Sequence, residues 1–168
     1  MSQNPSDLPR KVAAEFVGTA FLVATVIGSG SMATNLTKDI GLQLLVNSLI
    51  TGAVLVALIL TLQPVSAAFN PVVTAVEAAF GGISWRDAGF FSVAQIAGGT
   101  LGAVVANLMF DLDAVSISVH ERSGTGQWLG EVVATLGLVL VVFGSIRSGR
   151  TETIAFAVGG PIPGADRV

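Results

Sequence analysis

A short apolar segment that begins at an Asn-Pro pair constrains this chain more than any other feature of its sequence. Asn70 is a favoured N-cap residue, and Pro71 suits the first helical position because its missing N–H would be unpaired there anyway. The apolar run that follows ends at Gly81, so the sequence predicts a helix over about residues 70–80. Such a helix is roughly 15 Å long, about half the thickness of a bilayer core.

Apolar segments long enough to cross a bilayer lie on both sides of this short helix. The sequence predicts four spans, at about residues 12–30, 40–62, 88–110 and 128–146. A half-length helix between spans is typical of a re-entrant segment, which is tolerated only where protein or a water-filled cavity surrounds it. Its positive N-terminal end then points toward the midplane of the bilayer, where transport proteins place their sites.

The composition agrees with one transmembrane domain over residues 1–168. Hydrophobic residues make up 52% of the chain and charged residues 11%, which is too little charge to cover a soluble domain. We therefore expect an all-α membrane protein embedded in the lipid bilayer. A basic pair before an apolar segment is also typical of a signal peptide, but this segment is long for one, contains Glu15 and precedes further spans.

The residue content also excludes several functions. The net charge of −3 offers no basic patch for nucleic acid. The chain has no cysteine and one histidine, which excludes disulfides and leaves little room for a metal site. No nucleophile–base pair or metal triad is visible, so we expect neither a cofactor, nor a metal, nor an enzyme. We interpret the charged cluster at residues 120–122 as a solvated loop.

The basic residues predict how the spans are oriented. If the N-terminus lies in the cytoplasm, five basic residues lie inside: Arg10, Lys11, Arg86, Arg147 and Arg150. In the loops between spans, Lys38 and Arg122 then lie outside. This excess follows the positive-inside rule. We therefore expect a multi-pass protein of the cell membrane whose re-entrant helix enters from the cytoplasmic face.

The chain repeats one of its motifs. Residues 14–19, A-E-F-V-G-T, are echoed by residues 130–135, G-E-V-V-A-T, and each copy opens a span. Three spans separate the two copies if the first is counted, so the second copy has the opposite orientation. That arrangement is typical of inverted-topology repeats. A fifth apolar segment starts at about residues 153–160, and the proline-rich tail at 161–168 then interrupts it.

These residues resemble the aquaporin, or major intrinsic protein, family over about residues 12–160. The resemblance is carried by residues 14–19, by N-P-V-V-T at 70–74, by A-Q-I-A-G-G at 94–99 with L-G-A at 101–103, and by Gly130-Glu131 with Thr135. It implies an aquaporin-like bundle in which two inverted halves each donate a half-helix. It also implies a pore for water, glycerol or other small neutral solutes, and a homotetramer with one pore per subunit.

The sequence departs from the family pattern in three ways. Val72 replaces the usual alanine of the first motif. Ala68 stands where many members have histidine, and Ile50 falls near a filter position that is often aromatic, so we expect no narrow aromatic water filter. The second half-helix and a sixth span are not found before residue 168, so the second inverted repeat is incomplete and we expect a truncated form.

The resemblance and the residues together predict the site. Asn70 is either an ordinary helix cap or a pore amide that donates to a passing solute, beside Pro71, Val72 and Ile50. Glu15 and Glu131 lie within spans, where a charge needs a partner, and we expect both to be buried acceptors for backbone N–H groups of re-entrant loops. Gln95 is expected to fasten the loop to its span.

Two functions share every one of these motifs. The first is a channel for small neutral solutes. The alternative is a non-conducting fragment that associates with full-length channel subunits. With one half-helix and a partial fifth span, we expect the chain alone to conduct neither water nor glycerol.

Overall fold

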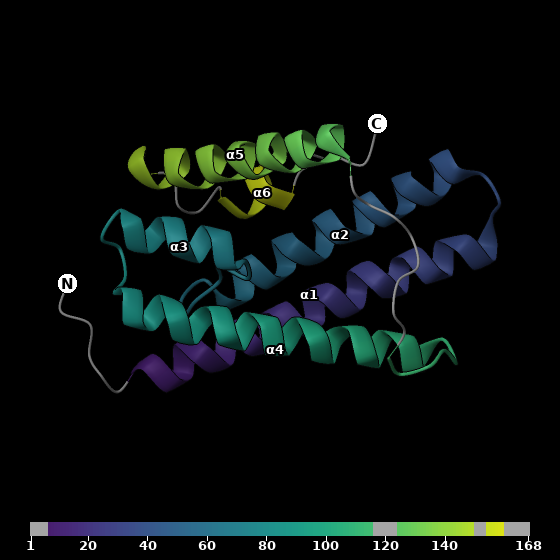
Figure 1. The fold of residues 1–168 in the computed structure, drawn as a ribbon, viewed down its shortest axis with the longest axis horizontal. Coiled ribbons are helices and arrows are strands. Elements are labelled where there is room, and N and C mark those ends of the chain that lie inside the picture. Colours follow the sequence, from purple (N-terminus) through teal and green to yellow (C-terminus); the bar gives the residue numbers. More distant parts are fainter. Residues whose placement is uncertain (1–6, 116–123, 150–153, 160–168) are drawn as a thin grey trace.

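The computed structural model of the chain describes residues 7–115, 124–149 and 154–159. Every regular element in these residues is a helix, which confirms the predicted all-α fold (Figure 1). Four helices of the described residues are long and apolar enough to cross a membrane. They are α1 (Leu8–Leu36), α2 (Ile40–Leu62), α4 (Trp85–Met109) and α5 (Thr125–Arg147), and two short helices accompany them, α3 (Pro71–Ala79) and α6 (Ile154–Gly159).

The first helix extends beyond the apolar segment at 12–30 in both directions. It starts early because Pro9 occupies its first turn, where a proline is favoured. It continues to Leu36, so the interval between the first two predicted spans, residues 31–39, is reduced to a connection at 37–39. The polar side chains of that stretch do not break the helix, because Thr34 Oγ1 donates to the Ser31 carbonyl at 2.8 Å within it. The expected tail at 161–168 lies outside the described residues.

Side-chain caps start the three helices that follow. Asp39 accepts a hydrogen bond from Leu42 N at 2.9 Å, Asn70 from Val72 N at 2.8 Å, and Ser84 from Asp87 N at 3.0 Å. Each cap satisfies one of the N–H groups that a helix leaves unpaired at its start. The local sequence therefore determines where α2, α3 and α4 begin.

The first and fourth helices pack closely because small residues line their contact. A Cβ atom at Gly98 would overlap the carbonyl oxygen of Phe16, and one at Gly102 would overlap that of Ala20. The two backbones can approach this closely only with glycine at both positions. Gly99 lies in the same contact, since a Cβ atom there would meet the side chains of Val23 and Thr19 on α1.

The short helix α3 has the form of a re-entrant segment. Its first residues lie near the middle of the long axis, and it ends at the same end of the molecule at which α4 begins (Figure 1). The chain therefore enters and leaves on one side. The α6 helix packs against α2, and an apolar cluster fills the space between them, consisting of Ile59, Phe69, Ile154, Ala155 and Val158.

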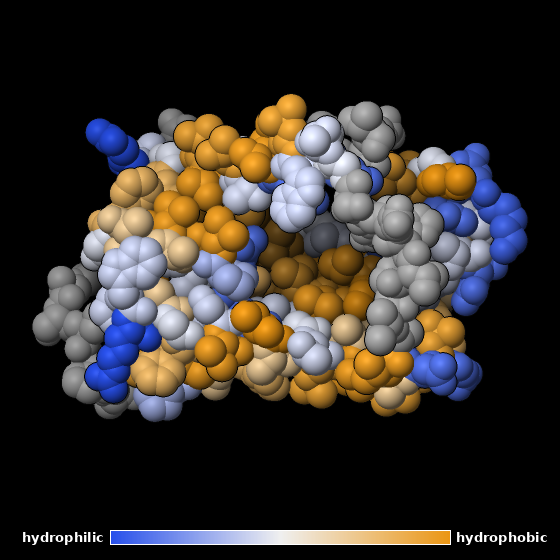
Figure 2. Space-filling model, in the orientation of Figure 1, coloured by the Kyte–Doolittle hydropathy of each residue, from blue (hydrophilic) through white to orange (hydrophobic). Residues whose placement is uncertain are grey.

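The surface of the molecule divides along the long axis. Hydrophilic residues gather at the two ends and apolar residues lie between them, and a hollow with an apolar floor opens in the middle of this face (Figure 2). The α5 helix forms one edge of the molecule in Figure 1, and none of its residues is buried in the described part of the chain.

The α1–α4 contact leads to a first prediction. Gly98→Ala forces the two backbones apart, because its Cβ would overlap Phe16 O. We expect it to destabilise the protein by about 1–3 kcal/mol, the usual cost of overpacking, and to lower the melting temperature in detergent. Gly89→Ala on the same helix is the matched control, since a Cβ there meets nothing within 4 Å. Equal melting temperatures for the two variants would contradict the close contact.

Candidate pore-lining site

A buried carboxylate on α1 holds the loop that precedes the half-helix. Glu15 is fully buried, and its Oε1 atom accepts hydrogen bonds from Ser66 Oγ and from Ala68 N, the latter at 2.9 Å. Its Oε2 atom accepts from Phe69 N and from Gln95 Nε2, both at 2.8 Å. The N–H groups of Ala68 and Phe69 lie outside regular secondary structure and need an acceptor, and this carboxylate supplies one.

The same network reaches the half-helix itself. Gln95 on α4 donates a second hydrogen bond from Nε2 to Thr74 Oγ1 on α3, at 2.9 Å. Gln95 is 1% exposed and Thr74 is 0% exposed. One side chain of α4 therefore ties the loop anchor on α1 to the second turn of the half-helix.

The residue before Asn70 has an unusual backbone. Phe69 has φ of 49°, in the left-handed region that non-glycine residues seldom adopt. In this conformation its N–H donates to Glu15 and its ring lies against Gly18, where a Cβ atom would overlap three ring atoms. Sequence analysis did not identify Phe69, Ser66 or Gly18 as part of the site. The available sequence signal was the bulky residue directly before the Asn-Pro pair.

Asn70 caps the half-helix at the tip of this loop. Its side-chain oxygen accepts from Val72 N, and its backbone oxygen accepts from Thr74 N at 3.0 Å. The cap uses the side-chain oxygen, and the side chain is only partly buried. An amide so oriented has its NH₂ group left for other acceptors. Pro71 and Val72 follow on the exposed side of the first turn.

A cavity of about 260 Å³ lies beside the loop and the half-helix. The polar residues that line it are Lys11, Gln63, Ser66 and Glu77. Apolar lining residues come from several helices, with Ile59 of α2, Val73 of α3, Phe91 of α4, Val142, Phe143 and Ile146 of α5, and Ile154 of α6. A largely apolar lining with a few polar groups is typical of a site that holds a small molecule.

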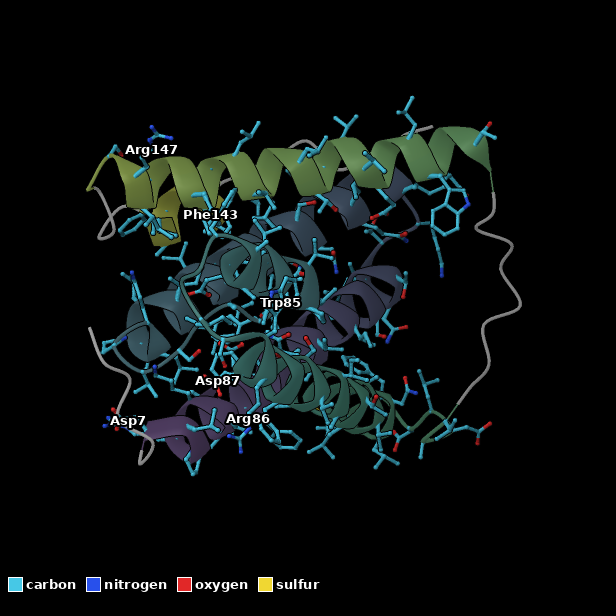
Figure 3. All side chains as sticks on the ribbon, turned by 60° about the vertical axis from the view of Figure 1, so that its left-hand side comes forward. Asp7, Trp85, Arg86, Asp87, Phe143 and Arg147 are labelled. Atoms are coloured by element: carbon cyan, nitrogen blue, oxygen red, sulfur yellow. The ribbon has the colours of Figure 1, made fainter. Side chains whose placement is uncertain are left out.

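An aromatic pair closes one side of the cavity. Phe143 of α5 projects from the helix (Figure 3), and its ring meets that of Phe80 edge to face, with centroids 5.3 Å apart. Phe80 follows the last residue of α3, so this contact joins the end of the half-helix to α5. The half-helix is thus held at its start by Glu15 and at its end by Phe143.

None of the predicted site residues is among those that line this cavity, although Ala68 and Val73, which lie close to Asn70 in the chain, do line it. Ile50 is on α2, is 40% exposed and does not line the cavity. Glu131 was predicted to be buried, and that is wrong for the described chain, because it is exposed on α5. The physical reason is that no loop of the described residues lies against Glu131 as residues 66–69 lie against Glu15, so nothing encloses its carboxylate.

The remaining charged groups form no metal site in the part of the chain that the structure describes. No group of three or more His, Asp or Glu side chains there is arranged to hold a metal ion. The charged cluster at residues 120–122 lies outside the described residues.

Four membrane-length helices with a capped re-entrant half-helix define a class of protein, the polytopic helical membrane proteins that contain a half-helix within the bundle. The sequence profile described as Major intrinsic protein matches residues 2–161. The chain belongs to this family, the aquaporin family.

Named relatives agree with this assignment. The chain is 46% identical to the aquaglyceroporin AqpS of Rhizobium meliloti over 91% of its own length and 66% of that protein. It is 34% identical to aquaporin NIP1-1 of Arabidopsis thaliana over 62% of its own length and 35% of that protein. It is 28% identical to aquaporin NIP3-1 of the same plant, over 93% and 54% of the two lengths. The chain thus spans about two thirds or less of the curated relatives that it matches.

The two glutamates lead to a second prediction. Glu15→Leu removes the acceptor of four hydrogen bonds, and each donor left unsatisfied in the interior costs about 1–3 kcal/mol, although Gln95 Nε2 keeps its bond to Thr74 Oγ1. We expect a large loss of folded protein and of melting temperature in detergent. Glu131→Leu, the same substitution on an exposed residue, is expected to change stability by less than about 0.5 kcal/mol. Equal losses for both variants would contradict the assignment of Glu15 as the loop anchor.

Proposed function

We propose that this chain forms one half-helix and one wall of a pore for water, glycerol or other small neutral solutes. The observation that carries the proposal is the loop before Asn70, whose backbone N–H groups at Ala68 and Phe69 are held by Glu15 and which lies beside a cavity. Non-helical backbone inside a membrane is tolerated where protein surrounds it or where it lines a water-filled path. The names of the relatives, aquaglyceroporin and aquaporin, support the same class of solute.

The electrostatics of the site favour neutral solutes. The N-terminal end of α3 carries a partial positive charge, and Asn70 places an amide beside it. A solute hydroxyl can accept a hydrogen bond from that amide, whereas a cation is repelled by the same end of the helix. Ala68 leaves the cavity wall without a bulky side chain at its position, which favours glycerol-sized solutes over water alone.

We also propose that the chain lies in the cell membrane with its N-terminus in the cytoplasm. Asp7, Arg86, Asp87 and Arg147 lie at the same end of the molecule (Figure 3). Two arginines at one end support a cytoplasmic location for that end.

Cysteine labelling tests this orientation. The chain has no cysteine of its own, so a single introduced cysteine reports one position. Asp7→Cys and Lys38→Cys place a thiol on exposed residues at the two ends of α1. We expect a membrane-impermeant maleimide, added to intact cells, to label position 38 and to leave position 7 unlabelled until the cells are opened. Labelling of both positions from the same side would contradict the proposed topology.

Proteoliposomes that hold only these 168 residues test conduction. The described residues provide one half-helix, and the hollow beside α5 is open on the face in Figure 2. We expect stopped-flow light scattering to give a water and glycerol permeability equal to that of empty vesicles. A permeability above that level, lost on Asn70→Leu, would contradict this expectation and show a working pore in the chain alone.

One observation favours the second candidate function, association with other channel subunits. The α5 helix is apolar and has no buried residue in the described chain, so its surface is available to a neighbouring subunit. A homotetramer, as the family resemblance implies, would cover part of this surface. Cross-linking of the detergent-solubilised protein, with and without a full-length family member present, distinguishes self-association from mixed assembly.

A further inference from the structure

We propose that Phe69 is the positioning residue of the half-helix: its ring, packed against Gly18, sets the place of Asn70 at the start of α3. The inference rests on the proposed function in one respect only, the role of Asn70 toward a solute. The position of the ring and its mechanical consequence can be tested without any conduction.

The backbone of Phe69 is strained and must be held in place. A left-handed conformation is unfavourable for a residue with a Cβ atom, which is why glycine usually occupies such positions. Here the position carries a phenylalanine at φ 49°. The hydrogen bond from its N–H to Glu15 at 2.8 Å holds one side of the residue. A glycine would adopt this backbone conformation without strain. We therefore infer that the phenylalanine ring contributes packing that a glycine could not provide.

The ring contributes by filling a junction between three helices. It is 6% exposed, and it belongs to the apolar cluster of Ile59 on α2 with Ile154, Ala155 and Val158 on α6. On its other side it lies against Gly18 of α1, where a Cβ atom would overlap the ring atoms Cδ1, Cε1 and Cζ. The missing side chain of Gly18 is therefore a notch that fits this ring.

The position of Asn70 follows from the position of this ring. Asn70 is the next residue along the chain, and its side chain caps α3 through Val72 N. A ring displaced from the notch must move the loop, because α1 is held by its close contact with α4 at Gly98 and Gly102. The first turn of α3 then moves with the loop. The notch at Gly18 thus determines where the pore amide lies.

A buried cysteine on the first turn of α3 reports such a movement. Val73 is 6% exposed and lines the cavity. The chain has no cysteine of its own, so a cysteine introduced at position 73 is its single thiol. In the Val73→Cys protein we expect slow labelling by a maleimide in detergent. Adding Gly18→Ala is expected to raise the labelling rate about tenfold, because labelling of a buried thiol follows the population of the open form.

Compensation distinguishes positioning from a general loss of packing. Leucine lacks the ring atoms Cε1 and Cζ, so Gly18→Ala combined with Phe69→Leu is expected to return the labelling rate to within about threefold of the parent. Gly137→Ala is the matched control, since a Cβ there meets nothing within 4 Å, and it should leave the rate unchanged. Ala106→Cys, at a position on α4 that is 0% exposed, reports global unfolding and should stay unlabelled in every variant.

Three results would overturn the proposal. They are an unchanged rate at position 73 in Gly18→Ala, an equal rise at positions 73 and 106, and a double variant labelled as fast as Gly18→Ala alone. Should Gly18→Ala fail to fold, Phe69→Ala empties the notch instead and must also raise the rate at position 73. If the labelling results hold and Asn70→Leu leaves the permeability of a conducting assembly unchanged, the positioning is right and the proposed role of Asn70 is wrong.

Discussion

The structure depends on one buried carboxylate. Removing the Glu15 side chain from water is costly, and it is compensated by four donors, two of them backbone N–H groups of the loop before Asn70. The loop gains as well, because a non-helical loop within a membrane has N–H groups that also need acceptors. Glu15 and the loop are therefore each tolerable in the membrane only because the other is present.

Helix packing brings the partners of this carboxylate within reach. Gly98 and Gly102 allow α4 to approach α1, and Gln95, one turn before Gly98, then reaches both Glu15 and Thr74. A bulkier residue in this contact would separate the helices, and the amide would lose one partner or the other. Small residues with no chemistry of their own thus position the polar network, and the network positions the half-helix.

The comparison of Glu15 with Glu131 shows that a motif does not by itself determine the environment of its residues. Both glutamates open an apolar span in a similar run of residues, yet Glu15 is fully buried and Glu131 is exposed. The difference lies in what faces each side chain in the described chain: residues 66–69 lie against Glu15, and no such loop lies against Glu131. A buried glutamate in this fold is a property of a helix and a loop together.

The sequence by itself determined what is local: apolar segments of membrane length, the coincidence of α2 with residues 40–62, and the half-helix that starts at Asn70. Those features follow from helix length, from capping and from the cost of apolar surface in water, each of which acts within a few turns. Tertiary packing determined the left-handed backbone of Phe69, the contact of its ring with Gly18 and the exposure of Glu131. These depend on groups far apart in the sequence, such as Glu15 and Phe69, which are 54 positions apart, and only the packed helices bring such groups into contact.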